Sequence, residues 1–253
     1  MRCVKLSTAC LVAFLGVAAS PIQAPDQTFE VRWRPSTEKI DTSPRIVLPL
    51  SPALHTRLVP SRLLLLDEDI RDESGYWVAL KGMELAVASA PYMVGCIIDG
   101  SNIFRERGIR LISDKFEICL TDRDDNGIFE GAFYYKSVFS SLAANGKIGK
   151  IVPVIGGKYR ELDPELSQQS PYISINLRFW KKGLTVRTCP DHKRQKLNRC
   201  FIEGDYQTFD PSSFPVDVRA YGTEFTLVRA DEKSVEVVFH KGFGNFEFSI
   251  HEE

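Results

Sequence analysis

The stretch CLTDRDDNGIFEGAFYY, residues 119–135, places a group of acidic residues between two apolar runs. The hydrophobic residues on both sides of the acidic group have the spacing of β-strands rather than of helices. They are Phe116, Ile118 and Leu120 before the group and Phe133 and Tyr135 after it. The central Asp-Asn-Gly is a strong signal for a tight turn between two strands. The stretch therefore predicts a β-hairpin with an acidic tip.

The same two-residue period continues along most of the chain. FEVRWR, residues 29–34, alternates large apolar side chains with charged ones, and FEFSI, residues 246–250, does the same. Further strands are predicted over 62–66, 76–81, 84–88, 92–98, 116–121, 128–135, 150–155, 172–178, 184–188, 201–206, 216–221, 224–229 and 234–240. Only residues 137–144 suggest a short helix. We predict an all-β protein of antiparallel strands with very little helix.

So many short strands exceed what one small sandwich holds, so we expect one extended sandwich or two packed β modules. LDPELSQQSP, residues 162–171, is polar and bounded by proline, and is the preferred boundary. It divides the chain into an N-terminal β module, 25–163, and a C-terminal β module, 164–253. The alternative is that 162–171 is only a long hairpin loop. The proline-spaced residues 34–52 are expected to form an extended crossing segment.

The chain begins with the layout of a secretory signal peptide. Arg2 and Lys5 precede an apolar run that ends near Ala19, and small residues follow. The run is shorter than the about 20 residues that span a bilayer. We predict that residues 1–24 are a signal peptide and that the protein is secreted or periplasmic and does not span the membrane.

Removal of this segment leaves 30 basic and 33 acidic side chains, a net charge of −3, which argues against a nucleic-acid partner. Four cysteines remain, and an even number in an exported chain favours two disulfides. Proximity in the sequence favours Cys96 with Cys119 and Cys189 with Cys200. Free buried thiols, or a zinc site that uses His192 with the second pair, are weaker alternatives.

The acidic tip also has the spacing of a metal-binding loop. Counted from Asp122, oxygen-bearing side chains stand at positions one, three, five and nine, which are Asp122, Asp124, Asn126 and Glu130. Position six is Gly127, and position seven, Ile128, offers its backbone carbonyl. This pattern resembles the calcium loop of the EF-hand family. The likeness is local, because position twelve is Phe133 instead of glutamate and the flanks are strands. It implies a structural calcium ion bound by Asp122, Asp124, Asn126, the Ile128 carbonyl and Glu130.

A simple acidic turn is the alternative to a calcium site. It explains the asparagine and the glycine, but not why four carboxylates gather around a single arginine, Arg123. Two carboxylates about 6 Å apart repel by roughly 0.7 kcal/mol in water and by about 3 kcal/mol at an effective dielectric constant of about 20. A divalent ion would convert that repulsion into ligation. Magnesium fits less well, because its octahedral geometry suits a chain-wound loop poorly.

A second charged segment, RTCPDHKRQKLNRC, covers residues 187–200. Lys193, Arg194 and Lys196 lie inside the expected second disulfide loop and could bind an anionic polymer. A run of charges is more often only a solvated hairpin tip.

The sequence contains no nucleophile elbow, paired-histidine metal motif or phosphate-binding loop. We therefore expect an exported, disulfide-stapled β-scaffold that acts as a binding or structural envelope protein, with a protein or another envelope component as its unknown partner. The alternative is a periplasmic or extracellular hydrolase whose catalytic carboxylates come from separate strands, an arrangement that leaves no local motif.

Overall fold

The computed structural model describes residues 27–37, 41–48, 51–98, 116–136, 145–180, 183–191, 207–231 and 233–249. These residues form antiparallel strands with two single-turn 3-10 helices, which confirms the all-β prediction. The elements are β1 (Thr28–Pro35), β2 (Arg45–Val47), β3 (Pro52–Pro60), β4 (Leu63–Leu66), β5 (Ile70–Asp72), β6 (Trp77–Ala79), β7 (Glu84–Ser89), β8 (Met93–Ile97), β9 (Phe116–Asp122), β10 (Gly131–Lys136), β11 (Gly146–Lys147), β12 (Val152–Ile155), β13 (Tyr159–Leu162), η1 (Pro164–Leu166), β14 (Tyr172–Trp180), β15 (Gly183–Asp191), β16 (Gln207–Phe209), η2 (Pro211–Ser213), β17 (Val216–Ala220), β18 (Thr223–Ala230), β19 (Val235–Lys241) and β20 (Phe248–Ser249).

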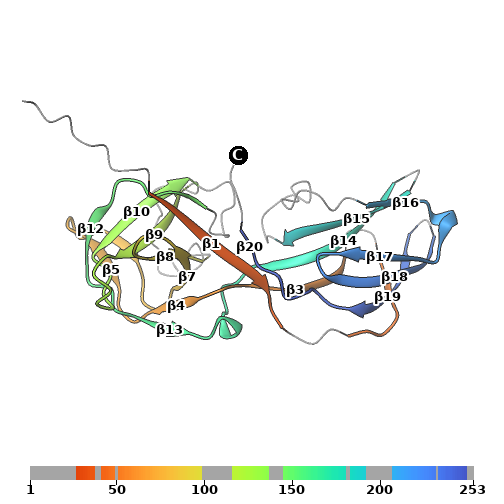
Figure 1. The fold of residues 1–253 in the computed structure, drawn as a ribbon, viewed down its shortest axis with the longest axis horizontal. Coiled ribbons are helices and arrows are strands. Elements are labelled where there is room, and N and C mark those ends of the chain that lie inside the picture. The colour runs from red at the N-terminus through yellow and green to blue at the C-terminus, as the bar shows by residue number, and fades with distance from the viewer. Residues whose placement is uncertain are drawn as a thin grey trace, which may run out of the picture.

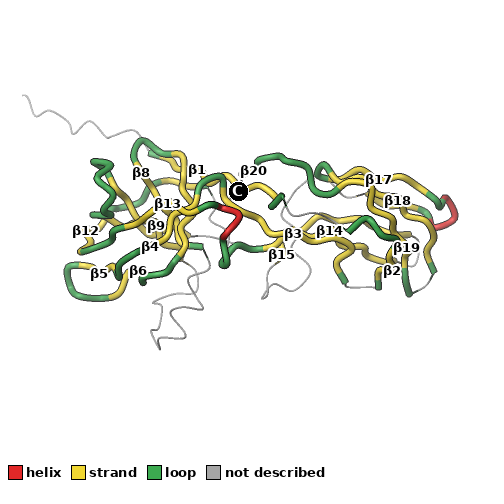
Figure 2. The backbone as a smooth tube through the Cα atoms, turned by 90° about the horizontal axis from the view of Figure 1, so that it is seen from below, coloured by secondary structure: helices red, strands yellow, loops and turns green. Residues whose placement is uncertain are grey.

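The molecule is elongated and has two lobes, which Figures 1 and 2 show from two directions. The first lobe contains β4–β13, and the second contains β2 and β14–β19. Strands β1 and β3 run through the middle of the molecule and pair with each other there.

The centre of the first lobe is the sheet β7-β8-β9-β10. Its two faces are both buried: Cys119 of β9 packs in one apolar cluster with Phe29 and Trp33, whereas the adjacent Leu120 packs in a second cluster with Phe129. Burial on both faces explains why these strands carry nearly continuous apolar runs instead of a clean alternation.

The edges of this central sheet are joined through β1. Strand β1 pairs with β7 and with β11, and the chain continues from β11 into β12, which pairs with β10. The β11–β12 segment therefore connects β10 back to β1, whose Phe29 and Trp33 lie in the first cluster. The hairpin between β9 and β10 belongs to this arrangement.

The second lobe is a sandwich of two four-stranded sheets, β16-β15-β14-β3 and β17-β18-β19-β2. Apolar side chains from both sheets form a third cluster, including Leu54, Ile175, Phe225 and Phe239. Strand β3 belongs to both lobes, because its first residues pair with β14 and its last three pair with β1.

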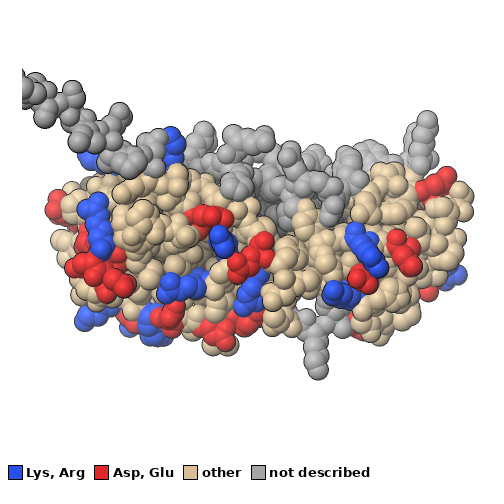
Figure 3. Space-filling model, viewed as in Figure 1, with Lys and Arg blue, Asp and Glu red and all other residues tan. Residues whose placement is uncertain are grey.

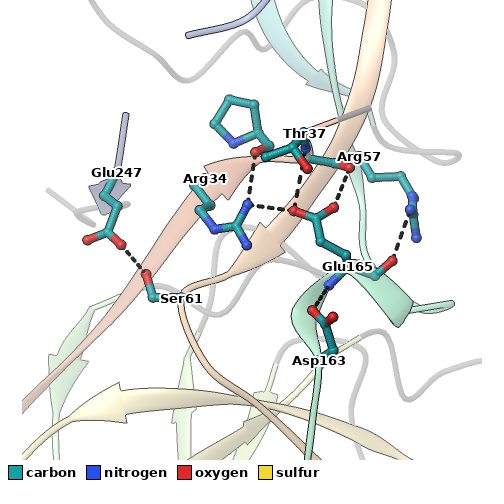
Figure 4. Close-up of polar contacts among 9 residues, drawn as sticks. Arg34, Thr37, Arg57, Ser61, Asp163, Glu165 and Glu247 are labelled. Atoms are coloured by element: carbon teal, nitrogen blue, oxygen red, sulfur yellow. Dashed lines mark hydrogen bonds and ion pairs between the residues drawn. The ribbon is translucent and has the colours of Figure 1, made fainter. Parts of the chain in front are cut away.

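The expected boundary at 162–171 is a short connection from β13 through η1 to β14. Polar contacts attach it to neighbouring strands: Glu165 pairs with Arg34 of β1 at 2.6 Å, and Arg57 of β3 donates to the Glu165 carbonyl (Figure 4). Arg57 also donates to the Ser167 carbonyl. The division at 163/164 stays a prediction. The strand pairings add β2 and the start of β3, which come earlier in the sequence, to the sheets of the second lobe.

Several strand predictions need adjustment. Strand β3 was not predicted, and the expected crossing segment 34–52 contains β2. The strand expected at 128–135 begins only at Gly131, because residue 128 makes an isolated bridge to Lys158 instead. The predicted signal peptide 1–24, the helix at 137–144 and the strand at 201–206 lie outside the described residues.

Positive and negative side chains are interspersed over the face drawn in Figure 3, without a large area of one sign. Within the described ranges, no helix has both the length and the apolar character that crossing a bilayer requires.

Candidate metal centre

The candidate site is the loop between β9 and β10, and β9 also carries one cysteine of the disulfide. Cys96 of β8 and Cys119 of β9 are directly opposite in the register, and they form the predicted disulfide with their Cα atoms 4.0 Å apart. Both cysteines are fully buried. The disulfide therefore fixes β9 three residues before Asp122. The predicted partner of Cys189, Cys200, lies outside the described residues, so the second disulfide stays a prediction.

Asp122, the last residue of β9, is fully buried, although it is a carboxylate. Its Oδ1 atom accepts a hydrogen bond from the Asn126 backbone N–H at 3.2 Å, and its Oδ2 atom accepts from the Gly127 N–H at 2.9 Å and from the Tyr159 hydroxyl at 2.7 Å. Three donors compensate the cost of removing this charge from water. Asp122 therefore organises the loop with or without a metal ion.

The turn itself uses two residues in the left-handed region. Asp125 has φ of 56° and Gly127 has φ of 83°, a conformation that aspartate tolerates and glycine adopts freely. Between them, Asn126 accepts a hydrogen bond on Oδ1 from the Ile128 N–H at 2.9 Å. This local bonding is typical of asparagine in turns and explains the Asp-Asn-Gly sequence.

The end of the loop is anchored in the core by Phe129, which is fully buried. Its ring stacks on Tyr159 with centroids 4.4 Å apart. Gly95 of β8 makes room for it, because a Cβ atom at that position would lie 3.2 Å from Phe129 Cζ. Tyr159 thus supports the loop twice, through its ring and through its hydroxyl.

Three carboxylates of the loop come together. One carboxylate oxygen each from Asp122, Asp124 and Glu130 lies within 4.8 Å of the other two. Oxygens bound to one calcium ion lie about 2.3–2.6 Å from it, so any two can be as far as about 5 Å apart. The triad could therefore hold a metal ion. Asp124 and Glu130 are exposed, which leaves room for water ligands.

The remaining contacts of the triad are made inside the loop. Glu130 Oε1 accepts from the Arg123 N–H at 2.7 Å, and Asp124 Oδ2 accepts from the Asn126 side-chain amide at 3.0 Å. These donors offset part of the repulsion between the carboxylates. Each carboxylate keeps lone pairs that these bonds do not occupy.

Electrostatics of the site centre on Asp122 and Tyr159. Burial opposes ionisation of Asp122, but the hydrogen bonds from Tyr159, Gly127 and Asn126 outweigh it and hold the Asp122 pKa below its usual value. Burial and the adjacent Asp122 carboxylate strongly raise the pKa of Tyr159. At neutral pH the pair is an ionised carboxylate and a neutral phenol, as ligation of a cation by Asp122 requires.

Of the five predicted ligands, the structure brings Asp122, Asp124 and Glu130 together. The Asn126 side chain lies between the Asp124 carboxylate and the Ile128 N–H, so its oxygen is already partly used. Sequence reasoning missed Tyr159, which follows a Gly-Gly turn and carries no local sign of its contact with Asp122.

The predicted anion-binding residues Lys193, Arg194 and Lys196 lie outside the described residues, as does His192. Comparisons with protein-family models, with curated proteins and with solved structures found no match to this chain.

Proposed function

We propose that this protein is an exported, disulfide-stapled β-scaffold with a binding or structural role, and that its 122–130 loop binds Ca2+ as a structural ion. The carboxylate triad of Asp122, Asp124 and Glu130 carries this proposal, because it lies at the tip of a hairpin whose first strand, β9, is joined to β8 by the Cys96–Cys119 disulfide. Export is supported by that disulfide, since disulfides persist mainly in oxidising compartments. The partner is a protein or another component of the envelope.

The donor set favours calcium of modest affinity. All the oxygens come from carboxylates, an amide and the Ile128 carbonyl, which are the hard ligands that Ca2+ prefers. Asp122 and Asn126 already accept hydrogen bonds from the loop, and position twelve, Phe133, supplies no bidentate carboxylate. We expect a dissociation constant of about 0.1–1 mM, the range of extracellular calcium modules.

Thermal unfolding with and without calcium tests the proposal. At ten times the dissociation constant, binding to the folded state alone adds about 1.4 kcal/mol of stability, which raises the melting temperature measurably. Asp124→Ala and Glu130→Ala should each abolish this rise. Asp124→Ala should barely change the melting temperature without calcium, because it also removes a repelling charge.

Asp217→Ala is the matched control, since Asp217 lies on β17 in the second lobe and its Oδ1 contacts Thr226. It should keep the full calcium shift. Magnesium at the same ionic strength should give a much smaller shift. A wild-type protein whose melting temperature does not change at about 10 mM Ca2+, tenfold above the weak end of the expected range, would show that the loop is only a turn.

The export part of the proposal has a separate readout. Expression of the full chain followed by cell fractionation should place the protein outside the cytoplasm, and N-terminal sequencing should start near residue 25. Recovery of the uncleaved chain in the cytoplasm would contradict export without affecting the calcium test.

A further inference from the structure

The acidic loop contains the dipeptide Asn126–Gly127, one of two Asn-Gly pairs in the sequence; the other is Asn145–Gly146. Asparagine is chemically labile, and most so before glycine, because glycine has no Cβ atom to hinder attack of its backbone nitrogen on the asparagine side chain. Asn126 is exposed, and a Cβ atom at Gly127 would meet open space. Solvent therefore has access to this pair.

The reaction open to such a pair is deamidation. The Gly127 nitrogen loses its proton to a solvent base and bonds to Asn126 Cγ. The bond between Cγ and Nδ2 then breaks, and Nδ2 leaves as ammonia with a proton supplied by the solvent. Water opens the resulting succinimide at either of its two carbonyls, which gives aspartate or isoaspartate. The reaction therefore needs no reactant other than water.

Three hydrogen bonds of the loop oppose this reaction. The Gly127 N–H donates to Asp122 Oδ2 at 2.9 Å, so loss of its proton would place a negative nitrogen against a buried carboxylate. Asn126 Oδ1 accepts from the Ile128 N–H at 2.9 Å, and Asn126 Nδ2 donates to Asp124 at 3.0 Å. The attacking nitrogen and the attacked side chain are both held, so the pair reacts when the loop opens.

The pair Asn145–Gly146 is held by a paired strand. Asn145 Oδ1 accepts from the Val31 N–H at 3.0 Å, and Gly146 of β11 lies opposite Phe29 of β1. A Cβ atom at Gly146 would lie 3.1 Å from the Phe29 ring, which belongs to the first apolar cluster. Exposed loops open at a lower free-energy cost than strands that pair in the core. The two pairs thus share the same chemistry but differ in the structure that must open.

We propose that Asn126 is the deamidation site of the folded protein and that the hydrogen bond from the Gly127 N–H to Asp122 controls its rate. The product carries a carboxylate where the Asn126 amide donates to Asp124, and isoaspartate also lengthens the backbone inside the turn. Deamidation therefore adds negative charge to the acidic loop and removes one of its hydrogen bonds. The inference depends only on the contacts of the loop and is independent of the calcium proposal.

Peptide mass spectrometry of the full protein tests the proposal. The protein is incubated at neutral pH with a calcium chelator, with and without urea, and conversion at both pairs is measured in the same sample. In the folded protein Asn126 should convert about tenfold faster than Asn145 or more, since each step of about 1.4 kcal/mol in the cost of opening changes a rate tenfold. In urea the two rates should be nearly equal, and both should be higher than in the folded protein.

Asp122→Ala tests the control of the rate. It should speed conversion at Asn126 about tenfold or more, the effect of losing a hydrogen bond to a charged group, and leave Asn145 unchanged. Asn145 is the internal control for folding, because global unfolding raises both rates together. If Asp122→Ala unfolds in this way, Tyr159→Phe decides, since it removes only the hydroxyl that donates to Asp122 Oδ2. It should speed conversion severalfold at Asn126 alone.

Tyr134→Phe changes an exposed tyrosine of β10 and should leave both rates as in the wild type. Conversion of Asn145 as fast as Asn126 in the folded protein would overturn the proposal. So would an intact Asn126 in the folded protein after many times the period that completes its conversion in urea. A wild-type rate at Asn126 in folded Asp122→Ala, or in Tyr159→Phe, would show that Asp122 does not control the reaction.

Discussion

The Tyr159 hydroxyl donates a 2.7 Å hydrogen bond to Asp122 Oδ2, although the two residues are 37 positions apart in the sequence. This bond joins the acidic loop to β13, whose Tyr159 packs against the core cluster that contains Phe129. The Phe129 ring stacks on the same tyrosine. The exposed loop is thus attached to the packed interior of the first lobe through Asp122 and Phe129, and its stability should depend on Tyr159.

Tyr159→Phe should destabilise the protein at neutral pH by about 1.5–3 kcal/mol, the usual contribution of a hydrogen bond to a charged group. The ring stack is kept, so the loss reports the hydroxyl alone. Chemical denaturation of both proteins measures the difference. Tyr134→Phe is the control, because Tyr134 is 44% exposed, and it should change stability by less than about 0.5 kcal/mol.

The same variant has a defined pH dependence. The folded-state pKa of Asp122 lies below its unfolded value of about 3.9, so its contribution to stability is complete above that pH and is lost as the pH falls through the folded-state pKa. The difference between wild type and Tyr159→Phe should therefore be constant near neutrality and shrink in acid below about pH 4. A difference that grows in acid would contradict an ionised Asp122.

Features set by neighbouring residues could be predicted from the sequence. The hairpin turn follows from the left-handed preference of Gly127, and the Cys96–Cys119 disulfide follows from proximity on adjacent strands. The carboxylate triad also lies within nine residues. Contacts such as Tyr159 with Asp122 could not be predicted, because the partner comes from a distant strand and leaves no local pattern.

Burial on two faces limited the strand predictions in a similar way. Strand β3, with the sequence PALHTRLVP, has the burial pattern of a strand that passes from one lobe to the other, so its apolar residues do not alternate. Proline at both of its ends further weakens the strand signal. Strands β17–β19, which have one buried face each, alternate regularly and were predicted almost to their ends.

Glu84 provides a second long-range test. This buried carboxylate of β7 accepts hydrogen bonds from the Ser167 hydroxyl, the Gln168 N–H at 2.8 Å and the Gln169 N–H at 3.2 Å. Glu84→Gln replaces the charge by an amide whose N–H2 group faces these donors. We expect a loss of about 1.5–3 kcal/mol. Faster amide hydrogen exchange at residues 168 and 169 should accompany it.

Glu161→Gln is the matched control for Glu84→Gln. Glu161 pairs with Arg62 at 2.7 Å, but both side chains are more than half exposed. Exposed pairs of this kind contribute about 0–1 kcal/mol. Equal losses for the two variants would mean that Glu84 does not hold the connection between the lobes.

The Cys96–Cys119 disulfide closes a loop with a sequence separation of 23. The chain-entropy model gives about 3 kcal/mol for such a loop, so the double variant Cys96→Ala/Cys119→Ala should lose at least that much stability. Because both cysteines are fully buried, dithiothreitol should reduce the disulfide only in denaturant. Mass spectrometry after alkylation measures the extent of reduction. If dithiothreitol reduces the disulfide of the native protein as fully as that of the denatured protein, the buried position is contradicted.

Arg34 and Glu165 form an ion pair at the lobe junction. Burial opposes ionisation of Glu165, but hydrogen bonds from Ser36 and Arg34, with the positive charge of Arg34, outweigh it and lower its pKa. Stability from this group is therefore present above its unfolded pKa of about 4.3 and is lost as the pH falls through the folded-state value. Glu165→Gln should cost about 1–3 kcal/mol at pH 7 and progressively less below about pH 4.

Glu236→Gln is the appropriate comparison for Glu165→Gln. Glu236 pairs with Arg229 at 2.7 Å, the same close range, but the Arg229 side chain is 77% exposed, against 20% for Arg34. Solvent screening should reduce its effect to below about 1 kcal/mol at every pH. Urea denaturation of both variants between about pH 3 and 8, which spans the titration of a carboxylate, measures the two profiles. If Glu165→Gln is as mild as Glu236→Gln, the junction is held by apolar packing instead of by this ion pair.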